Sequence, residues 1–114
     1  MGDVQYKQYT KEEDVLYNDS IDALRIRLAS GMKFDEACDK LNVTNADLRE
    51  CIVADFLKIC IAEMHYGKGM SIKELSLRLA ISEDRVLVAR KDMYEDIENA
   101  AISEYHKEQS KGRA

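Results

Sequence analysis

The chain has 114 residues, of which 46% are hydrophobic and 34% charged, and its formal net charge is −5. This length suits one domain or two very small units that share a core. No apolar stretch reaches the roughly 18 residues that cross a bilayer, and the first residues lack the basic and then apolar pattern of a secretion signal. We therefore expect a cytoplasmic protein with no membrane partner.

The composition predicts an all-α fold. Proline is absent, glycine occurs five times, and runs of Leu, Ala, Glu, Lys, Arg and Met favour helix. No Asn-Gly or Asp-Gly hairpin turn is present, so strands are not expected. Cys38, Cys51 and Cys60 lie on apolar helix faces, and we interpret them as small buried side chains rather than as a disulfide framework.

The first part of the chain, residues 1–18, is predicted to be an arm followed by a short helix. Thr10 and Glu13 have the spacing of a capping box at the start of that helix. Asn18-Asp19-Ser20 then offers a new cap for an amphipathic helix that ends at Ser30-Gly31. Its apolar residues are Ile21, Ala23, Leu24, Ile26 and Leu28.

A short helix over 33–41 and a long one over 45–66 are expected next, with Thr44 as the cap of the long helix. The long helix is apolar around much of its circumference, which predicts a place in the middle of the structure or in a dimer interface. Gly67 and Gly69 end it. Ser71 is expected to cap a helix to Leu79, and Ser82 a last helix to about residue 107. Residues 108–114 are polar and are predicted to be a disordered tail.

Residues 71–93 carry the pattern on which a functional prediction depends. Ser76 is small enough for two helices to cross closely, Ala80 stands at a sharp turn, and Ile81 fills the angle between the helices. Ser82 then caps the second helix. This pattern resembles the helix-turn-helix of many bacterial transcription regulators and of the promoter-reading region of sigma factors, although the family prefers glycine where Ala80 stands. The resemblance extends over about twenty residues.

The same pattern occurs 38 residues earlier, because residues 31–44 align with residues 69–82. Gly, Met, Glu and Leu are shared, and several other positions are conservative exchanges. We therefore predict five to six helices that form two tandem helix-turn-helix units and share the long central helix. The first unit is expected over 19–66 and the second over 67–107, within one compact domain.

The resemblance implies a small DNA-binding transcriptional regulator, because the second helix of such a motif enters the major groove. Base readers and phosphate contacts are expected in both units. The predicted DNA-binding residues are Lys33, Lys40, Thr44, Asn45, Arg49, Lys73, Ser82, Arg85, Val88 and Lys91. Residues 31–50 carry three basic against five acidic side chains, which does not favour DNA.

A second interpretation stays open, in which the chain is an acidic protein-interaction module with a helix-turn-helix shape. Leu87 and Val88 would then dock a regulator or part of the transcription machinery. A homodimer is also expected, through the central helix and an apolar face of the last helix, although the same residues could instead cover the first helices of one monomer. These residues of the last helix are Met93, Tyr94, Ile97, Ala101, Ile102 and Tyr105.

No catalytic or metal site is predicted. The chain has two histidines, His65 and His106, and Cys60 lies five residues before His65, on a different helix face. Gly67-Lys68-Gly69 lacks the remaining residues of a phosphate-binding loop. The carboxylate clusters at residues 12–14 and 95–96 are expected to face solvent. We therefore expect a protein that is not an enzyme and needs no cofactor.

Overall fold

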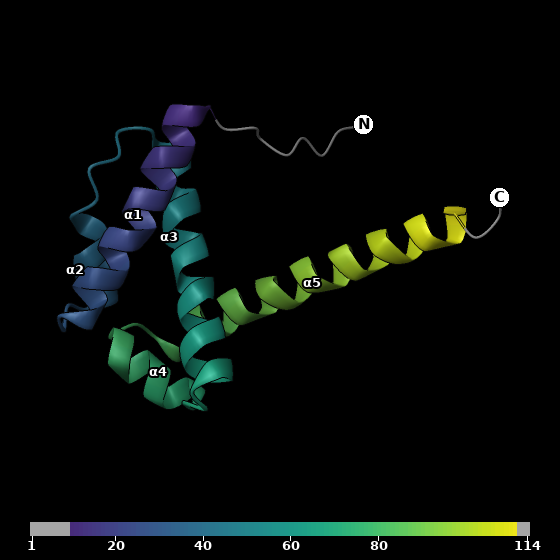
Figure 1. The fold of residues 1–114 in the computed structure, drawn as a ribbon. Coiled ribbons are helices and arrows are strands. Elements are labelled where there is room, and N and C mark those ends of the chain that lie inside the picture. Colours follow the sequence, from purple (N-terminus) through teal and green to yellow (C-terminus); the bar gives the residue numbers. More distant parts are fainter. Residues whose placement is uncertain (1–9, 112–114) are drawn as a thin grey trace. The chain divides into compact units, whose positions relative to one another are not determined.

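The computed structural model describes residues 10–111, and it describes side chains as far as residue 101. Every regular element in this range is helical, which confirms the all-α prediction (Figure 1). The elements are α1 (Lys11–Ala29), α2 (Phe34–Asp39), α3 (Ala46–Cys60), η1 (Ile61–Gly67), α4 (Ile72–Leu79) and α5 (Glu83–Lys111). None of these helices combines the length and the hydropathy that a membrane span requires.

The chain divides into two compact units, of which the first ends at Phe56 and the second begins at Leu57. The division therefore falls inside α3, whereas the sequence pattern placed it after residue 66. No glycine, proline or capping residue stands at Phe56 and Leu57, so the helix passes from one unit into the next without a stop signal.

α1 is one helix of 19 residues, and the predicted break at Asn18-Asp19-Ser20 is wrong. Its N-terminus is the expected capping box: the Thr10 hydroxyl accepts from the Glu13 N–H (3.1 Å), and the Glu13 carboxylate accepts from the Thr10 N–H (3.0 Å). Residues 18–20 lack proline and glycine, and Ser20 is buried beside Ile21. Burial of this face outweighs the weak helix propensity of the three residues. The helix ends as predicted, with Gly31 at φ +102°.

The core of the first unit is made by α1, α2 and α3. Phe34 and Phe56 stack with ring centroids 5.8 Å apart, and both side chains are fully buried. Their buried neighbours are Ile21, Leu24, Leu28, Ala37, Cys38, Leu48 and Ile52. Ile26 does not join them, contrary to prediction, because it lies on the opposite side of α1 and is 70% exposed.

The predicted single helix over 45–66 is an α-helix only to Cys60. From Ile61 to Gly67 the backbone takes the wider π-helical form. Gly69, at φ +73°, then redirects the chain, and the Met70 N–H donates to the Met64 carbonyl (3.0 Å). The His65 ring nitrogen Nδ1 is hydrogen bonded to the Met70 carbonyl (2.6 Å), which ties the π-helical end to the start of α4.

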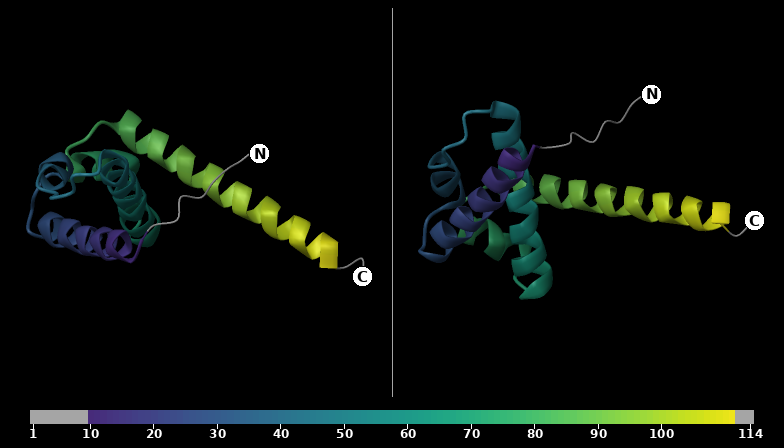
Figure 2. Two further views of the ribbon diagram at one scale, coloured as in Figure 1. Left: turned by 90° about the horizontal axis from the view of Figure 1, so that it is seen from above. Right: turned by 45° about the horizontal axis from the view of Figure 1, so that its top comes forward.

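α5 is a single helix of 29 residues (Figure 2). It continues to Lys111, so residues 108–111 are helical rather than part of the predicted disordered tail, since no proline or glycine interrupts the chain before Gly112. Residues 112–114 and the predicted arm at residues 1–9 lie outside the described range, as do the side chains of Ile102 and Tyr105.

All three cysteines are free thiols. Cys38 and Cys60 are buried as predicted, whereas Cys51 is half-buried. The Cys51 Sγ lies 3.7 Å from the Asp55 carboxylate, which also accepts a hydrogen bond from the Tyr17 hydroxyl (2.6 Å). Cys51 is half-exposed because this polar pair, rather than the apolar core, faces it.

Candidate nucleic-acid interface

α4 begins with a complete capping box. The Ser71 hydroxyl accepts from the Glu74 N–H (3.0 Å), and the Glu74 carboxylate accepts from the Ser71 N–H (3.4 Å). Ser76, which was predicted to permit a close helix crossing, is buried, and its hydroxyl donates to the Lys73 carbonyl (2.8 Å). The side chain is therefore buried without an unsatisfied polar group.

The turn between α4 and α5 consists of Ala80, Ile81 and Ser82. Ala80 adopts the left-handed conformation (φ 59°, ψ 43°), the one positive φ among the described residues other than glycine. The Ala80 N–H donates to the Leu77 carbonyl (3.3 Å), and the Ile81 N–H to the Ser76 carbonyl (3.1 Å). The Ser82 hydroxyl then accepts from the Arg85 N–H (3.1 Å), so that a cap opens α5 directly after the turn. The chain therefore bends at these residues, as the sequence predicted.

An apolar wedge holds the two helices of this pair. Leu75 and Leu79 of α4 and Val86 of α5 are fully buried, and Ala89 is buried beside them. Ile81 is only half-buried, so it covers the edge of the wedge rather than filling it. Since all four buried positions are apolar and lie at helical spacing, burial fixes which faces of α4 and α5 remain outside.

The outer face of the pair carries most of the predicted contact residues of the second unit. Lys73, Ser82 and Lys91 are exposed, Val88 is 61% exposed, and Arg85 is half-buried. Leu77 of α4, which the sequence did not single out, is 71% exposed. Leu77 is two residues from both Leu75 and Leu79, which places it on the other side of α4 from these buried leucines, and this spacing was the signal.

The charge of this segment opposes that of the whole chain. Residues 71–91 contain five basic and three acidic side chains, while the chain as a whole has a net charge of −5. The basic residues are Lys73, Arg78, Arg85, Arg90 and Lys91, and the acidic ones are Glu74, Glu83 and Asp84. The segment is therefore locally positive, although two of its carboxylates stand in the first turn of α5.

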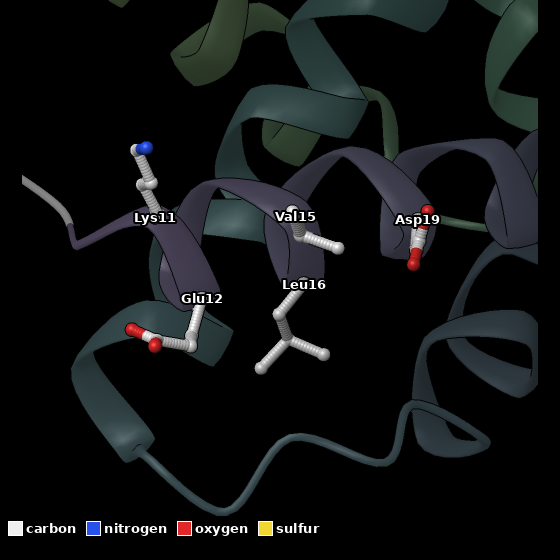
Figure 3. A pocket seen from close by; sticks show the side chains of 5 residues that line it. All are labelled: Lys11, Glu12, Val15, Leu16 and Asp19. Atoms are coloured by element: carbon white, nitrogen blue, oxygen red, sulfur yellow. The ribbon is translucent and has the colours of Figure 1, made fainter.

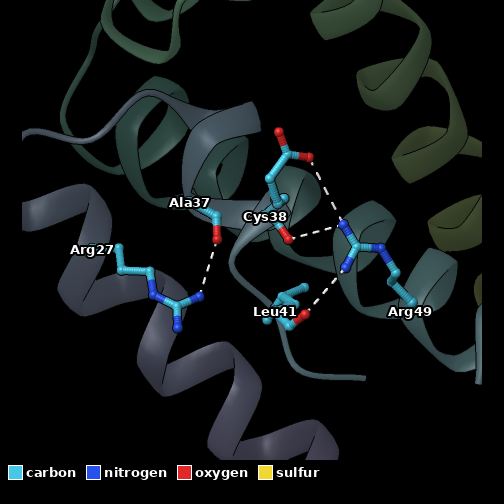
Figure 4. A network of polar contacts seen from close by, with 6 residues as sticks. Arg27, Ala37, Cys38, Leu41 and Arg49 are labelled. Atoms are coloured by element: carbon cyan, nitrogen blue, oxygen red, sulfur yellow. Dashed lines mark hydrogen bonds and ion pairs between the residues drawn. The ribbon is translucent and has the colours of Figure 1, made fainter. Parts of the chain in front are cut away.

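The predicted contact residues of the first unit are arranged differently. Asn45, not Thr44, caps α3, because its side-chain oxygen accepts from the Leu48 N–H (3.1 Å). The Arg49 guanidinium donates to the carbonyls of Cys38 (3.1 Å) and Leu41 (3.4 Å) (Figure 4). Both proposed base readers are thus hydrogen bonded to the backbone of their own unit. Lys33 and Lys40, at the two ends of α2, are exposed, as is Thr44.

α2 is held by a second arginine that the sequence did not identify. Arg27 of α1 donates from Nη1 to the Ala37 carbonyl (3.0 Å), so two guanidinium groups from two helices meet the last carbonyls of one short helix (Figure 4). A positive charge at a helix C-terminus is stabilising because the last carbonyls carry a partial negative charge. Asp39 lies 3.9 Å from Arg49 but is largely exposed, so it adds little.

A cluster of two tyrosines and an arginine lies where η1 approaches α5. The Tyr66 and Tyr94 hydroxyls are hydrogen bonded to each other, and the Arg90 guanidinium lies 5.8 Å from the Tyr94 ring centroid. The hydrogen bond with Tyr94 raises the pKa of Tyr66 above its ordinary value of 10.0, and the nearby Arg90 charge opposes this effect. Both rings remain about half exposed.

A shallow surface pocket follows one strip of α1 (Figure 3). Its lining residues are Lys11, Glu12, Val15, Leu16 and Asp19. All five side chains are exposed and come from consecutive turns of the same helix, so no second element converges on them. Within the described part of the chain, no group of three His, Cys, Asp or Glu side chains is placed to hold a metal ion.

The α4–α5 pair is therefore the place where a tight turn, exposed lysines and a locally positive charge coincide. Comparison of the chain with protein-family models, with curated proteins and with solved structures finds no match.

Proposed function

We propose that the chain is a small DNA-binding transcriptional regulator that uses α4 and α5 as a helix-turn-helix. The observation that carries this proposal is the turn at Ala80, Ile81 and Ser82. Its left-handed residue and its two backbone hydrogen bonds end α4, and the Ser82 cap starts α5 at once. In helix-turn-helix proteins this geometry presents the first turns of the second helix to the major groove.

The exposed side chains of the pair suit the two kinds of contact that such a helix makes. Lys73 on α4 and Lys91 on α5 are exposed cations for backbone phosphates. Arg85, in the first turn of α5, is the candidate for a guanine edge, and Val88 the candidate for a thymine methyl group. We assign the interface to this pair rather than to α2 and α3, because Asn45 and Arg49 already bind their own backbone.

Glu83 and Asp84 limit the affinity that this surface can have for DNA. They stand beside the helix N-terminus, where they stabilise α5 but repel phosphate. We therefore expect weak binding to random DNA and affinity for a specific site that comes chiefly from base contacts.

The test is selection of bound sequences from a pool of random DNA duplexes, followed by fluorescence anisotropy on the selected duplex with the full chain. The double variant Arg85→Glu with Lys91→Glu should lose binding at least about a hundredfold at low salt, because two favourable contacts become repulsive. The matched control is Lys33→Glu with Lys40→Glu, which changes the net charge equally and should retain most of the affinity. Equal loss in both variants, or no selected sequence, would refute the proposed surface.

The exposed apolar side chains favour one second candidate, a protein-docking module of the same shape. Leu77 is 71% exposed, Val88 61% and Leu87 39%, on helices that bury other apolar residues efficiently. This candidate predicts a partner that co-purifies from cells after nuclease treatment and is lost on Leu77→Asp. Ile26→Asp is the matched control, because Ile26 is 70% exposed on α1. A partner that disappears on nuclease treatment supports DNA binding instead.

A further inference from the structure

Tyr66 of η1 and Tyr94 of α5 form a pair of phenol side chains that the proposed DNA interface does not use. Their ring centroids lie 6.5 Å apart at an interplanar angle of 63°, and their hydroxyls are hydrogen bonded to each other. Both rings are about half exposed, so small reagents can reach them from solvent. The fold therefore brings together two phenols that are 28 residues apart in the sequence.

Other contacts hold the same stretch of α5 beside α3 and η1. The Arg90 guanidinium, one turn before Tyr94, lies 5.8 Å from the centroid of the Tyr94 ring. Two residues after Tyr94, the Asp96 carboxylate accepts from Lys58 Nζ (2.9 Å). α5 is thus tied to the preceding helix on the C-terminal side of Tyr94 as well as at Tyr94 itself, which keeps the ring close to Tyr66.

We propose that Tyr66 and Tyr94 are an oxidative modification site, at which the two rings couple to an intramolecular dityrosine. The co-reactant is hydrogen peroxide, used by a haem peroxidase. Because each ortho carbon is next to the carbon that bears the hydroxyl, the hydrogen bond between the hydroxyls also brings the ortho edges of the two rings near each other. Rotation about χ1 and χ2 of these half-exposed side chains supplies the remaining approach.

The coupling needs no group other than the two phenols and the oxidant. Each phenol gives one electron and its hydroxyl proton to the oxidant, and the two phenoxyl radicals form a carbon–carbon bond between their ortho carbons. The proton on each of these carbons then moves to the oxygen of the same ring, so that both phenols are regenerated. One hydrogen peroxide accepts the two electrons and the two protons and becomes two waters.

The cross-link closes a loop around the α4–α5 pair. Residues 67–93, between the two tyrosines, include all of α4, the turn at Ala80 and the first part of α5. A covalent link across this loop removes conformations from the unfolded chain and so stabilises the second unit, as a disulfide of similar span does. The inference does not depend on DNA binding, because Lys73 and Arg85 take no part in the reaction.

The first test is treatment of the full chain with a haem peroxidase and hydrogen peroxide, followed by reduction of any disulfides. We expect a monomeric product with dityrosine fluorescence, two hydrogen atoms lighter than the chain, whose yield does not depend on protein concentration. Methionine oxidation adds oxygen and is distinguished by mass. Digestion with trypsin and a glutamyl endopeptidase, which separates Tyr94 from Tyr105 at Glu95, should give a cross-linked peptide that contains Tyr66 and Tyr94.

Tyr66→Phe and Tyr94→Phe should each lower the yield of this product at least about tenfold, because phenylalanine keeps the ring but has no hydroxyl proton to lose. The matched control is Tyr17→Phe, which should retain the yield, since the Tyr17 hydroxyl is bonded to the Asp55 carboxylate (2.6 Å). A cross-link that maps to other tyrosines, a product that joins two chains only, or an unchanged yield in Tyr66→Phe would overturn the proposal. Absence of product under conditions that couple free tyrosine would do the same.

The second test measures thermal unfolding of the purified cross-linked chain by circular dichroism. We expect the Tm to rise by about 5 to 10 °C relative to the untreated chain, because the unfolded state is then closed into a loop across a separation of 28 residues. Peroxidase-treated Tyr66→Phe is the control for other oxidation and should show no such rise. An equal rise in this control, or no rise in the cross-linked chain, would refute a link between neighbours of the native fold.

Discussion

The helical pairs α2–α3 and α4–α5 align in sequence over 14 residues, yet the two helices of each pair are joined in different ways. In the second pair, three residues connect the helices, and Ala80 turns the backbone through the left-handed region. In the first pair the connection has six residues, and Lys40, which ends α2, has a φ of −85°. A similar pattern of apolar and capping residues therefore does not determine the length or the backbone conformation of the connection between the two helices.

The first connection is held by side chains instead of by its backbone. Leu41 and Val43 are buried along it, and Arg49 donates to the carbonyls of Cys38 and Leu41. An arginine that performs this task cannot reach a base edge at the same time. The comparison thus explains why a potential base reader in the first pair has a structural role, while Lys73 and Lys91 of the second pair remain exposed.

The largest expected effect concerns the apolar wedge of the second pair. Leu79→Ala should lower the free energy of unfolding by about 2 to 5 kcal/mol, because a fully buried side chain is removed and a cavity remains. Urea unfolding followed by circular dichroism measures it. Leu77→Ala, two residues earlier in the same helix and 71% exposed, is the control and should change the free energy by less than about 0.5 kcal/mol. Equal losses would contradict the assignment of buried and exposed faces.

The second prediction concerns the arginine that holds the first pair. Arg49→Met keeps much of the side-chain volume but removes the hydrogen bonds to the Cys38 carbonyl of α2 and to the Leu41 carbonyl of the connection. We expect a loss of about 2 kcal/mol in the free energy of unfolding, since hydrogen bonds from charged groups are the stronger kind. Lys33→Met removes an exposed cation that makes no capping bond at the other end of α2, and should have almost no effect. A stable Arg49→Met variant would mean that the backbone alone holds the first connection.

The smallest effect is a gain in stability at the turn of the second pair. Ala80→Gly should raise the free energy of unfolding by about 0.5 to 1 kcal/mol, because glycine adopts φ 59° without the steric cost that alanine meets there. The same substitution at Ala54, an exposed position within α3, should lower it by about 1 kcal/mol. Thermal unfolding of the two variants side by side gives the comparison. A loss at both sites would show that Ala80 is not left-handed.

Features that depend on neighbours in sequence could be predicted, and those that depend on distant partners could not. The caps at Thr10, Ser71 and Ser82, and the turn at Ala80, involve residues three to five positions apart, so their spacing reveals them. Arg27 and Arg49 bind carbonyls 8 to 11 residues away on another element, and no spacing rule identifies them. Because Arg49 is positively charged and lies near the start of a helix, the sequence pattern instead indicated a nucleic-acid contact.

The continuity of α1 and the π-helical end of α3 were missed for a related reason. Asn18-Asp19-Ser20 contains three residues that favour caps, but burial of Ser20 and Ile21 keeps them helical. The change from α to π at Ile61 has no marker in the residue types of that segment. In the second pair, which residues face outward was mostly predictable, because the apolar positions occur at helical spacing.

α3 passes through the boundary at Phe56 and Leu57 without a cap on either side. A fragment that ended or began there would have an uncapped helix terminus, at which up to four backbone N–H or C=O groups lose their hydrogen-bond partners. Recombination between genes at that point would interrupt α3 in both units. We therefore expect the two units to occur together in any gene that encodes either of them.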